Sequence, residues 1–82
     1  MDNQLYNKFA AAFAADSLSS LVESFNRNVD SRGWSSVRAY HDKALIDEFI
    51  RRGIDVSAVS DGKSISFAHH VALDGNRLVK ID

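Results

Sequence analysis

The sequence predicts an α+β domain: three helices followed by a three-stranded antiparallel meander of order 1-2-3, packed on the helices by one face. Apolar residues recur every three to four positions up to about residue 52, then alternate with polar residues from about residue 55 onward. Glycines lie between these segments. Because helices and strands are segregated along the chain, one helical layer against an antiparallel sheet is expected. We expect residues 1–82 to form a single domain.

The helical pattern occurs in three segments, at about 4–14, 17–28 and 35–52. In the first segment, Leu5, Phe9 and Phe13 are spaced by four residues, which places them on one face of a helix. Asp16 or Ser17 is expected to cap the second segment, because short polar side chains accept hydrogen bonds from the first backbone N–H groups of a helix. Ser20 and Glu23 also have the spacing of a capping box, so a start a few residues later is an alternative.

The third helical segment has the clearest boundaries. Ser35 or Ser36 is the candidate N-cap, and Gly53 can adopt the left-handed conformation just past the last turn. Asp42 interrupts the apolar face, so either this carboxylate lies at an exposed end of the apolar stripe or the helix breaks near His41. We expect one continuous helix.

The alternating pattern predicts strands at about 55–60, 63–73 and 77–81. The dipeptide Asp61-Gly62 is a signal for a two-residue hairpin turn, which would pair Ser60 with Lys63. This register collects the apolar residues of both strands on one face of the sheet.

The second hairpin turn is predicted to contain three residues, 74–76. That length pairs Val71 with Val79 and keeps both on the apolar face. Asn76 would then take a left-handed backbone conformation, which asparagine tolerates.

Composition excludes several classes of protein. The chain has no cysteine, so disulfides and thiolate metal sites are absent. The net charge is −1, so the chain lacks the excess of basic residues that binding to nucleic acid or to anionic lipid usually requires. The N-terminal segment has no basic region ahead of an apolar stretch, and no segment is long and apolar enough to span a membrane. We therefore expect a cytoplasmic protein.

No pattern of catalytic or cofactor-binding residues is present. In a strand, His69 and His70 would point to opposite faces, so they could not share a metal ion, and His41 is on a distant helix. There is no Gly-x-Ser-x-Gly turn and no glycine-rich phosphate loop. A chain of this length also has little volume for a ligand cleft. We expect no enzyme activity and no cofactor.

The predicted sheet suggests a surface for association. The outward face of the segment 63–73 is small and uncharged, and a plain solvent face is an equal alternative. The outer strands are open edges that invite pairing with another chain. The candidate partner-binding residues are Ser64, Ser66, Ala68, His70, Ala72 and Lys80. The leading hypothesis is a non-enzymatic protein–protein interaction or regulatory module that forms a homodimer through a sheet edge or face.

The alternative hypothesis is a nucleic-acid-binding protein similar to a winged helix, because three helices and a hairpin follow in that order. Its contact residues would be Arg38, Tyr40, His41, Lys43 and Lys63. Four pairs of opposite charge at i, i+4 argue against it, since paired cations are not free for phosphates: Arg38–Asp42, Lys43–Asp47, Asp47–Arg51 and Glu48–Arg52. Whether Trp34 and Tyr40 belong to the core or to an interface stays open.

Overall fold

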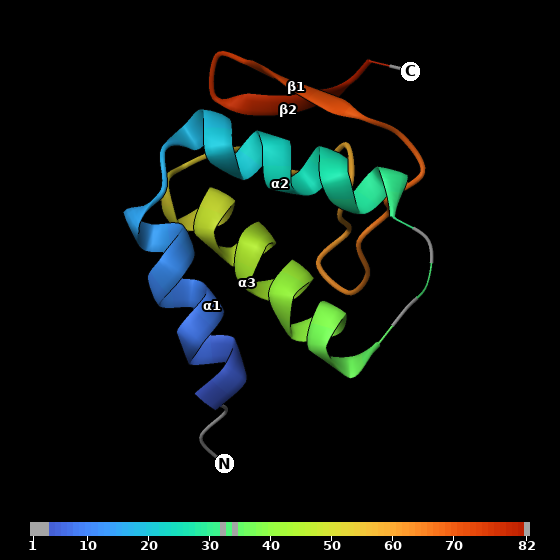
Figure 1. The fold of residues 1–82 in the computed structure, drawn as a ribbon. Coiled ribbons are helices and arrows are strands. Elements are labelled where there is room, and N and C mark those ends of the chain that lie inside the picture. Colours follow the sequence, from blue (N-terminus) through green and yellow to red (C-terminus); the bar gives the residue numbers. More distant parts are fainter. Residues whose placement is uncertain (1–3, 32, 34, 82) are drawn as a thin grey trace.

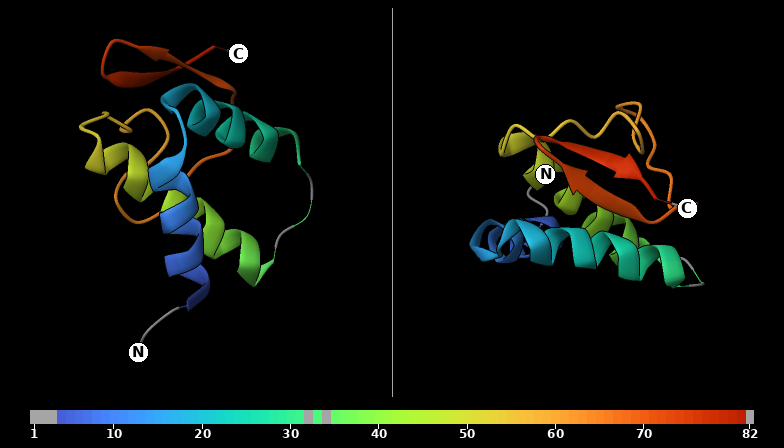
Figure 2. Two further views of the ribbon diagram at one scale, coloured as in Figure 1. Left: turned by 60° about the vertical axis from the view of Figure 1, so that its left-hand side comes forward. Right: turned by 90° about the horizontal axis from the view of Figure 1, so that it is seen from above.

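The helix α3 (Ser36–Arg51) is the element against which much of the rest packs, as the computed structural model shows for residues 4–31, 33 and 35–81 (Figure 1). The other elements are α1 (Gln4–Ala15), α2 (Leu18–Asp30), β1 (Val71–Asp74) and β2 (Arg77–Lys80). The helix α1 packs along α3, and β1 packs on α2. Figure 2 shows the segment 55–70 lying on a different side of α3 from α1. The α+β class and the three helices are confirmed, each helix within two residues of its predicted ends.

Both predicted N-caps involve a serine. The Ser17 hydroxyl accepts a hydrogen bond from the Ser20 N–H at 3.2 Å, and the Ser35 hydroxyl accepts one from the Arg38 N–H at 3.2 Å. Each bond satisfies a backbone donor that the helix itself leaves without a partner. The sequence pattern therefore sets the starts of α2 and α3.

The end of α3 is a Schellman motif. Gly53 has φ +78°, its N–H donates to the Ile50 carbonyl at 2.9 Å, and the Ile54 N–H donates to the Phe49 carbonyl at 2.9 Å. These two bonds satisfy carbonyls of the last turn. Phe49 and Ile54, at the two positions where a hydrophobic contact often accompanies this motif, are both buried.

The core lies between the three helices, the segment 54–59 and the inner face of the hairpin. Its buried members are Phe13, Leu21, Phe25, Ala44, Leu45, Ile46, Phe49, Ile54, Val56, Val59, Val71 and Leu78. Removal of this apolar surface from water is the main force that holds the elements together.

The predicted three-stranded meander is wrong, because the sheet has two strands, in the order β1-β2. Residues 55–60 form a turn in place of the first strand: the Val59 and Ser60 N–H groups both donate to the Val56 carbonyl, at 3.0 and 2.9 Å. This turn buries Val56 and Val59 together. A strand would point side chains three residues apart to opposite faces, so the core favours the turn.

The predicted strand 63–73 is also wrong over most of its length, since only residues 71–74 are strand. Ser60 and Ile65 form an isolated antiparallel bridge, which replaces the predicted pair of Ser60 with Lys63. The Asp61 carboxylate accepts hydrogen bonds from the N–H groups of Lys63 and Ser64, at 2.9 and 2.8 Å. These local bonds hold a four-residue loop and lower the pKa of the Asp61 carboxyl group.

The hairpin of β1 and β2 has a two-residue turn, not the predicted three-residue turn. Asp74 pairs with Arg77, which leaves Gly75 and Asn76 as the turn. Gly75 has φ +62° and Asn76 does not have positive φ, the pattern of a type II′ turn. Asn76 therefore does not take the predicted left-handed conformation.

The change of turn length moves side chains between the two faces of the hairpin. Leu73 pairs with Leu78, and Leu78 is buried together with Val71. Val79 pairs with Ala72 on the other face, and Ile81 is 59% exposed. A shift of one residue in register reverses which face every side chain of a strand occupies.

Both outer edges of the hairpin meet another part of the chain. On β1, the Asn26 side chain accepts a hydrogen bond from the Val71 N–H at 2.8 Å and donates one to the Val71 carbonyl at 3.0 Å. On β2, the Leu78 N–H donates to the Asp55 carbonyl at 2.9 Å. The predicted open edges are therefore partly occupied.

No helix in the described residues 4–31, 33 and 35–81 combines the length and the apolar content needed to cross a membrane.

Candidate functional site

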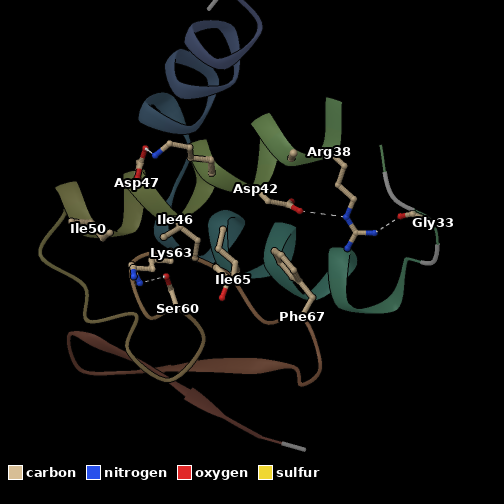
Figure 3. A pocket seen from close by; sticks show the side chains of 14 residues that line it. Gly33, Arg38, Asp42, Ile46, Asp47, Ile50, Ser60, Lys63, Ile65 and Phe67 are labelled. Atoms are coloured by element: carbon tan, nitrogen blue, oxygen red, sulfur yellow. Dashed lines mark hydrogen bonds and ion pairs between the residues drawn. The ribbon is translucent and has the colours of Figure 1, made fainter. Parts of the chain in front are cut away.

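A groove of about 780 Å³ lies between α3 and the loop 60–67 (Figure 3). This volume is within the range typical of binding sites, although the length of the chain predicted little room for a cleft. The groove is lined by Gly33, Arg38, Ala39, Asp42, Lys43, Ile46, Asp47, Ile50, Ser60, Gly62, Lys63, Ser64, Ile65 and Phe67.

The apolar lining comes from both walls. Ala39, Ile46 and Ile50 lie along one side of α3 at spacings of seven and four residues. Ile65 and Phe67 project toward them from the loop (Figure 3). Phe67 is held by its ring, which stacks on a buried phenylalanine of α2 with centroids 4.7 Å apart. Ile50 is 55% exposed, so the groove presents an aliphatic side chain to solvent.

Three cationic side chains line the same groove: Arg38, Lys43 and Lys63. The Lys43 ammonium lies 3.1 Å from the Asp47 carboxylate, and Arg38 Nε lies 3.4 Å from Asp42 Oδ2. Lys63 is exposed, and none of the described residues forms an ion pair with its ammonium group. The groove therefore holds one cation that has no carboxylate partner within residues 4–31, 33 and 35–81.

The carboxylate of Asp47 is engaged from two sides. Besides its ion pair with Lys43, it accepts a hydrogen bond from the Tyr6 hydroxyl of α1. This hydrogen bond, burial and the nearby negative charge raise the pKa of Tyr6 to about 12. Tyr6 is therefore a hydrogen-bond donor at neutral pH.

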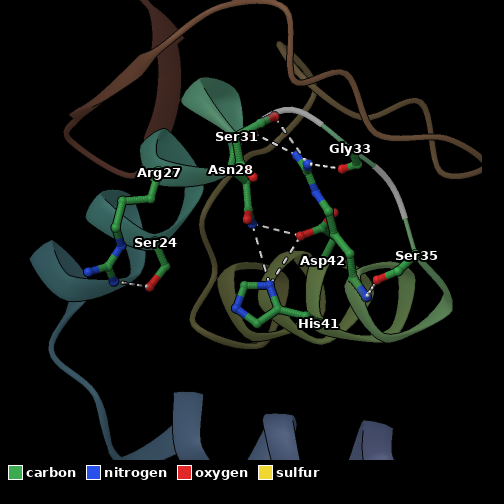
Figure 4. Close-up of polar contacts among 9 residues, drawn as sticks. Ser24, Arg27, Asn28, Ser31, Gly33, Ser35, His41 and Asp42 are labelled. Carbon is green, nitrogen blue, oxygen red and sulfur yellow. Dashed lines mark hydrogen bonds and ion pairs between the residues drawn. The ribbon is translucent and has the colours of Figure 1, made fainter.

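A cluster of polar side chains joins the N-terminal half of α3 to the end of α2 (Figure 4), and it includes the groove residues Gly33, Arg38 and Asp42. Asp42 is 6% exposed, which corrects the expectation that this carboxylate would lie at an exposed end of the stripe; α3 is continuous through it. The Asn28 amide donates to Asp42 Oδ1 at 2.7 Å, and His41 Nδ1 lies 3.1 Å from the same oxygen. These contacts compensate for removing the carboxylate from water.

Arg38 links this cluster to the end of α2. Its guanidinium group donates to the carbonyls of Asn28, Ser31 and Gly33, at 2.6, 3.2 and 2.8 Å. Asn28 and the Ser31 cap belong to the last turn of α2, where carbonyls lack helical partners and a cation suits the helix dipole. Arg38 is therefore fixed by α2 as well as by α3.

A second ion-pair cluster lies at the other end of α3, away from the groove lining. Glu48 is 5% exposed, and its carboxylate accepts from Arg51 Nη2 at 2.5 Å and from Arg52 Nε at 2.6 Å. The hydrogen bond from Arg51, with that from Arg52 and both positive charges, outweighs burial and lowers the pKa of Glu48 to about 2.

The six residues predicted to bind a partner do not form one surface. Ser64 lines the groove, whereas Ser66 and Ala68 are exposed farther along the same loop. The other three lie at the hairpin: His70 precedes β1, Ala72 is in β1 and Lys80 is in β2. They are separated because the strand that would have aligned them does not form.

The residues of the nucleic-acid alternative are only partly brought together. Arg38, Lys43 and Lys63 share the groove, whereas Tyr40 is not among its lining residues. His41 instead packs edge-on against two phenylalanine rings of α1, each with its centroid 5.1 Å away. Trp34, which the sequence left open between core and interface, lies outside the described residues.

Three of the four predicted i, i+4 ion pairs form, those of Arg38 with Asp42, Lys43 with Asp47 and Glu48 with Arg52. In place of the fourth, Arg51 pairs with Glu48 three residues before it.

The paired histidines lie in an irregular segment rather than in a strand. His70 Nε2 lies 2.6 Å from a carboxylate oxygen of Asp30, at the end of α2, and His69 is half-buried. Across residues 4–31, 33 and 35–81, no group of three or more histidine, aspartate and glutamate side chains is arranged to hold a metal ion.

The sequence did not identify the apolar residues of the groove as a site. Ile46 and Ile50 belong to the same apolar stripe of α3 as Leu45 and Phe49, but Ile50 is exposed whereas the other three are buried. The available signal was the width of the apolar stripe, since these four residues span more of the helix than one packing partner covers.

Comparison of the chain with protein-family models, with curated proteins and with solved structures found no match. The site therefore has to be interpreted from its own geometry.

Proposed function

We propose that the protein is a non-enzymatic protein–protein interaction module of the cytoplasm, and that the groove between α3 and the loop 60–67 is its binding surface. The observation that carries this proposal is the exposed aliphatic side chain of Ile50 in a groove of about 780 Å³. Exposed apolar side chains gathered in a concave site are typical of surfaces that bind a partner. The cytoplasmic location is supported by the absence of cysteine.

The protonatable groups beside the groove favour binding over catalysis. General acid–base catalysis needs a side chain that can reach a substrate and exchange a proton. Asp42 is buried beneath contacts from Asn28 and Arg38, and Asp47 is held by Tyr6 and Lys43. Both carboxylates stabilise the fold around the groove, and this supports a non-enzymatic function.

The proposal is tested by selecting binders from a library of random dodecapeptides displayed on phage, with the whole chain immobilised. A selected peptide is then titrated into ¹⁵N-labelled protein. We expect the backbone signals of Ile46, Ile50 and Ile65 to shift. Failure to enrich any peptide, or shifts confined to α1 and the hairpin, would contradict the proposal.

Self-association through the hairpin is a second candidate, because Ile81 is 59% exposed and Val79 shares the outer face with Ala72. Such a face could bury apolar surface between two copies of the chain. Sedimentation velocity at micromolar concentration tests it: a homodimer that dissociates in an Ile81→Lys variant supports this candidate, and a monomer at every concentration rejects it.

A further inference from the structure

We propose that the partner bound in the groove is an acidic, aliphatic peptide segment, which places branched aliphatic side chains against Ile46, Ile50 and Ile65 and pairs a carboxylate with Lys63. This inference rests on the proposed function, because it names the chemistry of the partner for the same groove.

The charge of the groove favours an acidic partner. Its lining contains three cations, Arg38, Lys43 and Lys63, and two carboxylates, Asp42 and Asp47, so its formal charge is +1. Each carboxylate already contacts one of the cations within the chain. Lys43 and Lys63 are both exposed, but Lys63 has no ion-pair partner within residues 4–31, 33 and 35–81. Its ammonium group would therefore gain most from an incoming carboxylate.

The shape and chemistry of the walls favour a peptide. On α3, Ile50 is exposed and the buried Ile46 lies at the floor of the groove, and the facing loop contributes the small residues Ser60, Gly62 and Ser64. Small side chains allow another backbone to approach closely, and polar hydroxyl groups can bond to peptide groups. Aliphatic side chains of the peptide would lie on the isoleucines while its main chain follows the loop.

Nucleic acid fits the same groove less well. A phosphate backbone is bound by several cations at once, each free to replace a counterion. Lys43 has its carboxylate partner Asp47, and Arg38 is held by the carbonyls of α2 in addition to Asp42. Lys63 alone would give weak binding to phosphates, whereas one ion pair beside an apolar contact is typical of peptide recognition.

The test compares selections of displayed random dodecapeptides on the wild-type chain and on a Lys63→Glu variant. We expect wild-type binders to combine aliphatic residues with Asp or Glu. Affinity for those peptides should fall about tenfold in Lys63→Glu, because an attractive pair becomes a repulsive one. The variant should instead enrich peptides that contain Lys or Arg. Lys63 is exposed, so this change should leave the fold intact, which circular dichroism checks.

Two matched controls locate the effect. Lys80→Glu makes the same change of charge on β2, outside the groove, and should leave peptide affinity unchanged. Ile50→Ser and Ile81→Ser shorten isoleucines that are 55% and 59% exposed, and only the first should weaken binding, by about tenfold.

The outcomes separate this inference from the function on which it rests. Enriched peptides without an excess of Asp or Glu, or equal losses in Lys63→Glu and Lys80→Glu, would overturn the acidic partner and leave a binding groove. Failure to enrich any peptide would overturn both. A duplex DNA that binds the wild type and is released by Lys63→Glu would overturn the peptide in favour of nucleic acid.

Discussion

Each end of α3 is joined to an earlier helix by an arginine, but the two arginines are held by different contacts. At each end an arginine contacts a carboxylate four residues away on α3 and donates to carbonyls at the end of an earlier helix. Arg52 contacts Glu48 and the carbonyls of Phe13 and Asp16, which end α1. Arg38 contacts Asp42 and the carbonyls that end α2. The helix α3 is thereby joined to both of its predecessors.

The difference lies in what neutralises each carboxylate. Glu48 has two guanidinium partners within 2.6 Å, those of Arg51 and Arg52. Asp42 has one, Arg38 at 3.4 Å, and its shortest contact is with the uncharged amide of Asn28 at 2.7 Å. Charge dominates at the C-terminal end of α3, whereas hydrogen bonds to α2 dominate at the N-terminal end. Asp42 and Arg38 also line the groove, so the end of α3 with the fewer and longer ion pairs is the one beside the proposed binding surface.

The largest expected effect is that of Glu48→Gln. This change leaves Arg51 and Arg52 without their carboxylate, and breaking a buried ion pair from one side costs about 3 kcal/mol. Urea unfolding followed by circular dichroism measures the loss. Asp74→Asn is the matched control, because the Asp74–Arg77 pair is 63% and 61% exposed, and it should change the free energy of unfolding by less than about 0.5 kcal/mol.

The second prediction concerns pH. The pKa of Glu48 is about 2 in the folded chain, below its value of about 4.3 in an unfolded chain. The resulting stabilisation is complete above the unfolded pKa and is lost as pH falls from about 5 to about 2, with a total on the order of 3 kcal/mol. The difference in unfolding free energy between wild type and Glu48→Gln should shrink over this range. A difference that stays constant with pH would contradict the ion-pair interpretation.

Asp42→Asn should cost less than Glu48→Gln, about 1 to 2 kcal/mol, since only one longer ion pair is lost along with a buried acceptor. The same urea experiment compares the two variants directly. If Asp42→Asn proves as costly as Glu48→Gln, the contrast drawn between the two ends of α3 is wrong.

Replacing either linking arginine by lysine should have similar, smaller effects. Lysine keeps the charge but cannot reach a carboxylate and several carbonyls at once, so Arg52→Lys and Arg38→Lys should each cost about 1 kcal/mol. Thermal unfolding compares the two. A loss confined to one of them would show that the other arginine contributes by charge alone.

The smallest effect on stability is expected for Ile50→Ser. Its side chain is 55% exposed and lies beside the core, so the free energy of unfolding should change by less than about 0.5 kcal/mol. A large loss in urea unfolding would place Ile50 in the core and remove it from the groove surface.

The helices could be predicted from the sequence because their signals are local. Ser17 and Ser35 cap helices, Gly53 ends one, and periodic apolar residues lie between these positions. Each signal acts within a few residues, through hydrogen bonds that the neighbouring backbone provides.

The strands could not be predicted in the same way. An alternating pattern of apolar residues fits either a strand or a turn, and packing against the rest of the fold decides which of them forms. Val56 and Val59 are compatible with a strand by composition, yet both are buried in a turn. The register of the hairpin depended on whether Asp74 belongs to the strand or the turn, a difference of one residue. The groove was missed for a related reason, since it needs α3 and the loop 60–67 to meet across the fold.

The amide of Asn26 acts toward Val71 as a surrogate peptide group, because it offers one acceptor and one donor at the spacing of a neighbouring strand. A foreign strand growing along β1 would first have to displace it. On the opposite side of the hairpin the Asp55 carbonyl engages the Leu78 N–H in the same way, so both edges have backbone groups that are already bonded and closed to edge-to-edge pairing.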